Sequence, residues 1–278
     1  MLERRTILQA LATAALLPDV AEAATAPRTR EDDFMTWAKL TADLSGKTTY
    51  SLAVGTVWGF KPQADDVALV DFAKRLYGYQ ALVVRQAHLA ADGAVSIKSK
   101  SWTFYQEPQG YTFVDKLPNP YTGLVDDCPP MSGAGEQVLT VDGPRRAAAS
   151  YPVESLKPDR PYDLRVKVVG DQAFVTETGF TRLQPGGIAW WKLEGQLVSH
   201  TCRAADLTNP KLSHIPNTWS HNLIAEWQTW MRMHGTPGHI LFKGDGCNVA
   251  PSQLPADLRA ALEKYFPGSF DEVAQWHG

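Results

Sequence analysis

The chain has 278 residues and a formal net charge of −3, with 44% hydrophobic and 21% charged residues. This length and composition are typical of a folded protein with a sizeable core, and the sequence lacks the basic stripe of a nucleic-acid-binding protein. We therefore expect no nucleic-acid partner. No run of about 18 consecutive apolar residues is present, so we expect no stable membrane anchor.

The first residues have the features of a twin-arginine signal peptide. Arg4 and Arg5 precede an uncharged segment, 6–17, and small residues flank Glu22 at a cleavage site. We expect the twin-arginine translocase to recognise this leader, and the protein to be periplasmic or secreted. The predicted division of the chain is a signal peptide over 1–23, a tether over 24–30 and a single β-rich domain over 31–278.

The remaining sequence is dominated by strand patterns. Apolar residues at helical spacing predict a helix over 31–44, and a period of two follows. Turn pairs predict hairpins at Asp92-Gly93, Gly170-Asp171 and Glu194-Gly195. The predicted strands are 50–58, 67–72, 80–89, 95–105, 137–141, 162–169, 172–183, 188–193, 196–204 and 238–243. A second helix is expected over 255–265 because proline opens it and follows its end.

The segment 107–135 is predicted to be irregular, because its prolines are incompatible with central strands. No alternation of strands with helices is present, which argues against a parallel sheet. The predicted fold is therefore mainly β: a curved antiparallel sheet or barrel, lipocalin-like or two packed half-barrels, with an N-terminal and a C-terminal helix. The two halves would be residues 48–115 and 137–204.

Several short motifs follow one another in a characteristic order. They are Trp58-Gly59, Glu107-Pro108, the loop Asn119-Pro120-Tyr121-Thr122-Gly123 and the segment Trp230–Gly238. In this order the chain resembles the domain-of-unknown-function 1838 family, whose members are often exported by the twin-arginine route. The resemblance covers nearly all of the sequence after the leader, and it implies the fold and compartment but no reaction. The chain has Leu124 and Glu107 where the family favours an acidic residue and an aspartate, so neither loop is assigned a catalytic acid.

Strong catalytic signatures are missing from the sequence. It contains no Gly-x-Ser-x-Gly elbow, no phosphate-binding glycine loop and no His-Glu-x-x-His helix. His200 and Cys202 share a strand face, but no histidine spacing repeats a known ligand frame, so we predict neither a metal nor a cofactor. Cys128, Cys202 and Cys247 leave three possible disulfide pairings, and the sequence does not select one.

General acid–base groups are the remaining candidates for chemistry. We assign His200, Glu177 and His88 as candidate catalytic residues. Glu177 lies within a predicted strand, either on the solvent face or buried with a raised pKa that suits an acid or a base. The candidate ligand-binding residues share a large aromatic or cationic side chain: Trp58, Arg85, Trp102, Trp190, Trp191 and Trp219. Trp190 and Trp191 are adjacent and must point to opposite faces of a strand.

Two functions fit these features. The first is an exported enzyme that acts on a hydrophobic or aromatic small molecule in an aromatic-lined cavity, as an isomerase, cyclase, lyase or hydrolase. The second is a periplasmic binding protein or carrier with the same cavity and no catalysis. The number of polar residues on predicted apolar faces favours a cofactor-independent isomerase or lyase.

Overall fold

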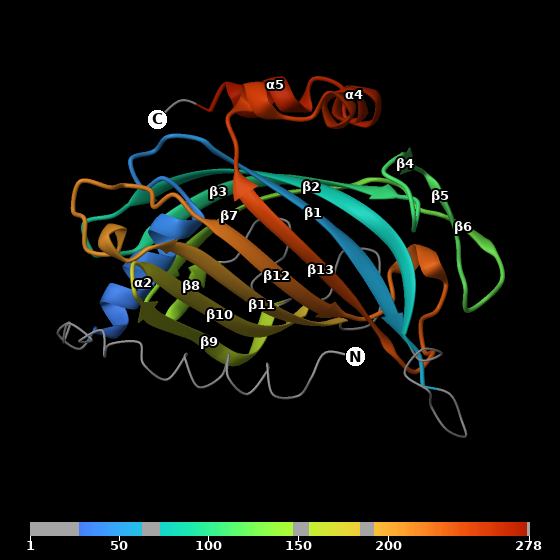
Figure 1. Ribbon diagram of the computed structural model, residues 1–278, viewed down its shortest axis with the longest axis horizontal. Helices are drawn as coiled ribbons and strands as arrows, with labels where there is room; N and C mark the ends of the chain where they lie inside the picture. The colour runs from blue at the N-terminus through green and yellow to red at the C-terminus, as the bar shows by residue number, and fades with distance from the viewer. Residues whose placement is uncertain (1–27, 63–72, 147–155, 184–191, 277–278) are drawn as a thin grey trace, which may run out of the picture.

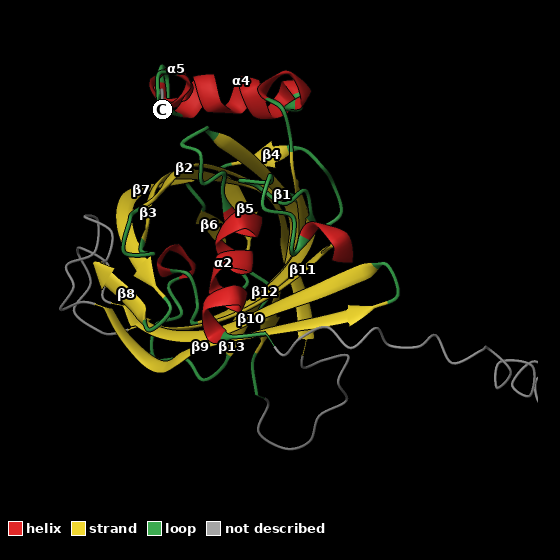
Figure 2. Cartoon of the chain, turned by 90° about the vertical axis from the view of Figure 1, so that its left-hand side faces the viewer, coloured by secondary structure: helices red, strands yellow, loops and turns green. Residues whose placement is uncertain are grey.

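The alternating segments form one strongly curved antiparallel sheet that wraps around a helix (Figures 1 and 2). The computed structural model describes residues 28–62, 73–146, 156–183 and 192–276. In sheet order, the strands are β8 (Gly143–Arg146), β7 (Met131–Thr140), β3 (Val95–Gln106), β2 (Ala73–Leu89), β1 (Thr49–Phe60), β13 (His239–Asn248), β12 (Thr218–Ala225), β11 (Lys192–Arg203), β10 (Gln172–Leu183) and β9 (Leu156–Val169). In the described residues β8 and β9 are the two ends of this order, and the sheet does not close into a barrel.

The helix inside the sheet, α2 (Arg30–Thr41), begins with a capping box. The Thr29 side chain accepts a hydrogen bond from the Asp32 backbone, and the Asp32 carboxylate accepts one from the Thr29 N–H. Phe34 and Ala38 of α2 pack against one wall of the sheet, which β2, β3 and β7 form. Leu40 packs against the other wall, from β10 and β11. The helix therefore fills one end of the concave space.

The two C-terminal helices, α4 (Ala256–Tyr265) and α5 (Ser269–Ala274), cover the outer, convex face of the sheet. Leu258 and Leu262 of α4 belong to one cluster with Leu82, Trp102 and Phe104 of β2 and β3. These two strands are thus covered by helices on both faces. Burial on both faces accounts for the density of apolar and aromatic residues in their sequences.

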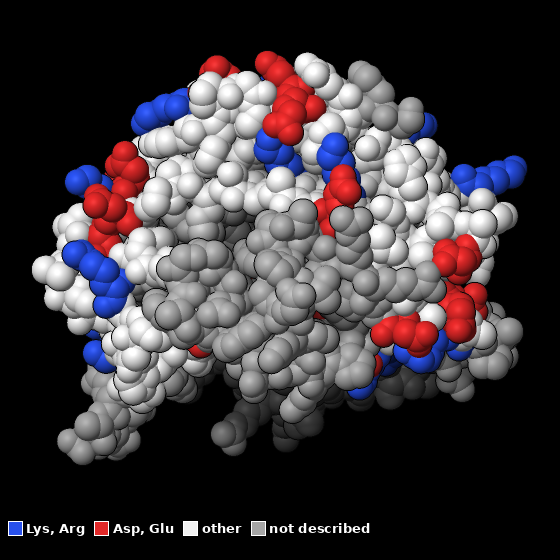
Figure 3. Space-filling view, turned by 180° about the vertical axis from the view of Figure 1, so that it is seen from behind, with Lys and Arg blue, Asp and Glu red and all other residues white. Residues whose placement is uncertain are grey.

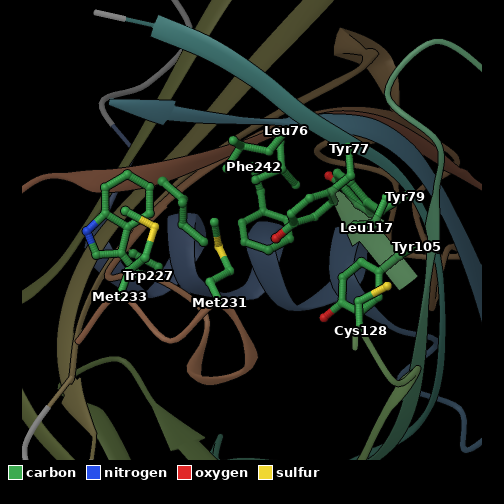
Figure 4. Packing of buried hydrophobic residues seen from close by; sticks show 13 residues of the cluster. Leu76, Tyr77, Tyr79, Tyr105, Leu117, Cys128, Trp227, Met231, Met233 and Phe242 are labelled. Atoms are coloured by element: carbon green, nitrogen blue, oxygen red, sulfur yellow. The ribbon is translucent and has the colours of Figure 1, made fainter. Parts of the chain in front are cut away.

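The end of the concave space opposite α2 is packed by three short strands and a 3-10 helix. These are β4 (Phe113–Val114), β5 (Lys116–Pro118), β6 (Val125–Asp127) and η4 (Thr229–Met231). Leu117, Cys128 and Met231 join Tyr77 and Tyr105 of the sheet in one buried cluster (Figure 4). A further 3-10 helix, η3 (Ala204–Asp206), follows β11, and η5 (Pro251–Gln253) precedes α4.

Most of the predicted elements are confirmed. The two helices form within a few residues of their predicted bounds, and the hairpins at Asp92-Gly93 and Gly170-Asp171 form with both glycines at positive φ. The curved antiparallel sheet with a helix at each end is also confirmed. The two hairpin-rich halves are parts of one continuous sheet, because β1 pairs with β13 along ten residue pairs.

Two local predictions were wrong, and strand β12 was missed. The expected turn at Glu194-Gly195 does not form; β11 runs through it, and Gly195 pairs with Phe180 on one side and Ile224 on the other. Strand β12 was not predicted, because histidine, asparagine and serine interrupt its apolar pattern. The segment 107–135 is not wholly irregular, since it contains β4, β5, β6 and the start of β7. The predicted strand 67–72 and residues 188–191 lie outside the described residues, as does the predicted leader 1–23.

On the face shown in Figure 3, lysines and arginines alternate with carboxylates around the rim. Among the described residues, no helix has the length and apolar character needed to cross a membrane.

Candidate binding and catalytic site

Strand register places two predicted catalytic residues side by side on the concave face. His200 of β11 pairs with Val175 of β10, and Glu177 pairs with Val198. Val175 packs with α2, so residues at even spacing from it also face the concave side. Glu177 and His200 are therefore diagonal neighbours on this face, with backbones about 7–8 Å apart.

Arg85 reaches the same interior from another wall. It lies two residues before Ala87 of β2, whose side chain packs with α2, so Arg85 also faces inward. Burial lowers the pKa of Arg85, and the negative charge of Glu177 opposes this effect. The side chain nevertheless retains partial solvent exposure.

Glu177 is held by the helix inside the sheet. The indole Nε1 of Trp37 donates a hydrogen bond of 2.7 Å to Oε2 of Glu177, whose residue is only 6% exposed. Burial raises the pKa of the carboxyl group, while the Trp37 hydrogen bond and the positive charge of Arg85 act in the opposite direction. Glu177 is thus a buried carboxyl group in a site that also contains a histidine and an arginine.

The hydrogen bonds around His200 define its tautomer. Nδ1 lies 2.9 Å from Oδ1 of Asn217, and Nδ2 of Asn217 donates to the carbonyl oxygens of Leu40 and Ile215. Because the two carbonyls fix the amide nitrogen on their side, the oxygen faces His200 and Nδ1 carries the proton. Burial lowers the pKa of His200, which favours the neutral ring. Nε2 then holds a lone pair, and no described residue donates to it.

A second polar pair lies beside these groups. The Tyr79 hydroxyl is 3.0 Å from Nε2 of His221, and the Trp219 ring lies 5.5 Å from that of His221. Burial raises the pKa of Tyr79 and lowers that of His221. A neutral phenol that donates to a neutral imidazole leaves fewer buried polar atoms unpaired than the reverse arrangement. In that arrangement Nδ1 of His221 carries a proton, and this buried nitrogen has no partner among the described residues.

Two glycines of β13 make room for these rings. A side chain at Gly244 would collide with the Tyr79 hydroxyl, and one at Gly246 would collide with the Trp219 ring. The two aromatic side chains therefore lie flat over bare backbone, as glycine within a strand permits. This packing fixes Tyr79 and Trp219 as part of the concave wall.

The two most specific sequence motifs meet at the opposite end of the sheet from α2. Asn119 of the Asn-Pro-Tyr-Thr-Gly loop donates from Nδ2 to Asp126 at 2.9 Å and to the Met231 carbonyl at 3.2 Å. Arg232 donates to the same Asp126 carboxylate from Nε at 2.9 Å, and also from Nη2. Asp126 is buried and Arg232 is exposed. These motifs thus form a buried polar contact, which we call the joint, and they do not contribute to the group of Arg85, Glu177 and His200.

Comparison with known protein families finds a match to part of the chain. Residues 192–275 match the family described as "Protein of unknown function (DUF1838)". The C-terminal part of the chain is thus similar to the DUF1838 family. The matched stretch includes β11, β12, β13 and the C-terminal helices, and so it contains His200, Trp219 and His221 but neither Arg85 nor Glu177. No curated protein matches the chain.

The fold brings together only some of the candidate residues. Arg85, Glu177, His200 and Trp219 share the concave face. Trp102 lies on the convex face beneath α4, where it is fully buried. The remaining candidates lie elsewhere: Trp58 on the convex face, His88 exposed near the end of β2, and Trp190 and Trp191 outside the described residues.

Sequence reasoning missed four polar participants: Trp37, Tyr79, Asn217 and His221. Trp37 lies within the predicted helix 31–44, at a position that fits its apolar spacing, and nothing in the local pattern indicates that its indole meets a carboxylate. The pair of glycines in β13 is a usable signal for Tyr79 and Trp219, because strand glycines often accommodate a neighbouring ring.

Metal ligands do not gather in the part of the chain that the structure describes, where no three histidine, cysteine or acidic side chains form a metal-holding group. Cys128, Cys202 and Cys247 form no disulfide with one another. Burial raises the pKa of Cys128 to about 12, so its thiol stays protonated at neutral pH.

Proposed function

We propose that this protein is an exported enzyme that acts on a hydrophobic or aromatic small molecule by general acid–base chemistry in the concave interior of the sheet. The observation that carries the proposal is the convergence of His200 and Glu177 on one concave face, with Nε2 of His200 unpartnered among the described residues. A neutral histidine and a buried carboxyl group are a suitable pair for moving a proton within a bound molecule.

The chemistry follows from the orientation of His200. Its Nε2 lone pair accepts a proton from a carbon or oxygen of the ligand, and Asn217 stabilises the resulting imidazolium through Nδ1–H. Returning that proton to another atom of the ligand completes an isomerisation, and loss of a leaving group instead completes an elimination. Both reactions balance without an external oxidant or reductant, which is consistent with a cofactor-independent isomerase or lyase.

The walls of the interior support a ligand with an apolar or aromatic body. Trp219 and Tyr79 lie flat against β13, and Tyr79 makes edge contacts with Phe242. Aromatic rings favour contact with other rings and with apolar surfaces. Ala81 and Val83 on the same face keep partial exposure, so this part of the wall is accessible to a ligand.

A carrier without catalysis is the alternative. The observation that favours it is that the Glu177 carboxylate and Nδ1 of His200 already have protein partners, Trp37 and Asn217, which a purely structural role would also require. The two functions differ in one measurable respect: only the enzyme transfers a proton to or from the ligand.

Hydrogen exchange into a probe ketone separates the two. The protein is incubated with 1-tetralone in D2O, and deuterium at the α-carbon is measured by mass spectrometry. We expect wild type to accelerate exchange above buffer and His200→Gln to reduce the acceleration at least tenfold, while His88→Gln, an exposed matched control, retains it. Binding of the ketone without accelerated exchange would leave the carrier and exclude the enzyme.

We further propose that residues 1–23 direct the folded protein through the twin-arginine translocase to the periplasm or beyond. The paired Arg4 and Arg5 support this proposal. Replacing both by lysine should leave the protein in the cytoplasm, as measured by fractionation and immunoblotting. Unchanged secretion of the double variant would contradict twin-arginine export.

A further inference from the structure

The partners of Arg85 differ from those of several other arginines of the described chain. Several arginines of the described chain are paired with a nearby carboxylate: Arg28 with Asp33, Arg165 with Asp163, Arg203 with Asp206 and Arg232 with Asp126. Arg85 faces the interior and has no such pair among the described residues. Its single hydrogen bond with them runs from Nη1 to Oγ of Ser51, over 3.5 Å.

The nearest acidic influence on Arg85 is Glu177, and this carboxylate does not occupy the guanidinium. Oε2 of Glu177 accepts the Trp37 indole N–H instead. A guanidinium has five N–H donors in a planar fork, so most of those on Arg85 remain available to a molecule in the interior. A buried, unpaired cation is costly unless something supplies the opposite charge.

Three neighbouring side chains, those of Ser51, Asn248 and His214, extend the contact of Arg85 into a directed chain of hydrogen bonds. Ser51 accepts from Arg85 and donates to Oδ1 of Asn248 at 2.7 Å, which leaves Nδ2 of Asn248 to donate to Nε2 of His214 at 2.8 Å. Every donor in this chain points away from Arg85. The chain therefore favours a positive charge at its origin and holds Ser51 as a fixed acceptor.

From this geometry we infer that the interior site binds the carboxylate of its ligand at Arg85, so that the ligand is a monoanionic aromatic or hydrophobic carboxylic acid. This inference rests on the proposed function, because it names the class of molecule that the same concave site takes. The fork of the guanidinium matches the two oxygens of a carboxylate. A doubly charged phosphate is disfavoured, because one cation would have to neutralise both charges close to Glu177.

The orientation of the ligand follows from the same contacts. With its carboxylate at Arg85, its apolar body extends along the wall that contains Trp219, while His200 and Glu177 lie on the neighbouring strands. The carboxylate then anchors the molecule, and a bond away from the anchor meets Nε2 of His200. Arg85 is in this scheme a binding residue, and Ser51 is a positioning residue that acts through it.

Isothermal titration calorimetry with matched probes tests the inference. 2-Naphthoate and its neutral isostere 2-naphthamide differ in charge and little in shape. We expect wild type to bind 2-naphthoate at least tenfold more tightly than 2-naphthamide, and Arg85→Gln to reduce this preference to within twofold. Arg165→Gln removes an exposed arginine that pairs with Asp163, and it should retain the full preference.

One further variant and one further ligand complete the test. Ser51→Ala should reduce the preference about two- to fivefold, and it serves as the second variant if Arg85→Gln fails to fold. 2-Naphthyl phosphate should bind more weakly than 2-naphthoate; tighter binding would contradict the assignment of a carboxylate. Equal binding of 2-naphthoate and 2-naphthamide to wild type would overturn the anion site and leave the proposed function standing. Failure of both compounds and of 1-tetralone to bind would overturn the inference and the proposed function together.

Discussion

The carboxamide of Asn119 joins two parts of the chain that are more than a hundred residues apart. Asn119 is 3% exposed; its Nδ2 donates to Asp126 at 2.9 Å and to the Met231 carbonyl at 3.2 Å, and its Oδ1 accepts from the Tyr121 N–H at 3.0 Å. Asn119→Ala removes all three hydrogen bonds and leaves their partners in place. The variant therefore measures how strongly the contact between the 119–123 loop and the 230–238 segment stabilises the fold.

The three hydrogen bonds of Asn119 contribute different amounts to the free energy of unfolding. A hydrogen bond to a buried carboxylate contributes about 1.5–3 kcal/mol, and each bond to a neutral backbone group contributes about 0.5–1.5 kcal/mol. We therefore expect Asn119→Ala to lower the free energy of unfolding by about 3–5 kcal/mol. Arg232 still pairs with Asp126 in the variant, so the carboxylate keeps one partner. Since folded domains have a total stability of about 5–15 kcal/mol, the variant should be folded but much less resistant to denaturant.

Urea unfolding followed by tryptophan fluorescence is a suitable assay, because Trp227 and Trp230 lie beside the joint. The midpoint should fall while the slope with urea stays constant. Thr122→Ala, in the same exposed loop, is the matched control and should stay within about 0.5 kcal/mol of wild type. A loss below about 1 kcal/mol for Asn119→Ala would refute the reasoning, since the buried carboxamide would then contribute no more than a surface residue.

Three further predictions concern the concave face. Burial raises the pKa of Glu177 above its ordinary value of 4.5, so the stability of wild type is greatest below pH 4.5 and falls as the pH rises towards the folded-state pKa. Glu177→Gln should therefore have a higher melting temperature than wild type at pH 8 and the same melting temperature at pH 4. Equal melting temperatures of the two proteins at pH 8 would contradict this prediction. Burial lowers the pKa of His200 below 6.5, so the stability that the neutral ring contributes is lost as the pH drops below that value. His200→Gln should therefore flatten the thermal stability profile below pH 6.5; an unchanged slope would count against a neutral, buried ring. Gly246→Ala should lower the free energy of unfolding in urea by about 1–3 kcal/mol and shift the fluorescence emission of Trp219, because the added methyl group collides with that ring. Wild-type values for both quantities would mean that the ring does not lie on the strand.

Half of the polar site was accessible to sequence reasoning. A period of two placed Glu177 within a predicted strand, with its face left open, and placed His200 on the same strand face as Cys202; both were singled out as candidate acid–base groups. Their proximity was not predictable, because the turn expected at Glu194-Gly195 implied a different register for β11. The correct register follows from the pairing of His200 with Val175.

Long-range partners account for the rest of the site. Arg85, Trp37 and Glu177 come from β2, α2 and β10, and only the curvature of the sheet brings them to one interior. Trp102 is another residue whose surroundings could not be predicted from the sequence. On one face of its strand, Lys98 and Lys100 are followed by Trp102 and Phe104. This pattern identifies an apolar end of the face, but not whether a cavity or a C-terminal helix covers it; α4 covers it here.

The sequence by itself determined the elements whose cause is local. The helix with its Thr29 cap, the strands on each side of Gly93 and Gly170, and the antiparallel character of the sheet follow from periodicity and from turn residues that adopt positive φ. Only the tertiary structure decided that β1 pairs with β13, which side of the sheet is concave, and which polar groups meet there. The physical reason is that strands associate through backbone hydrogen bonds that are the same for every residue, so the partner of a strand is selected by packing across the whole fold and not by the residues beside it.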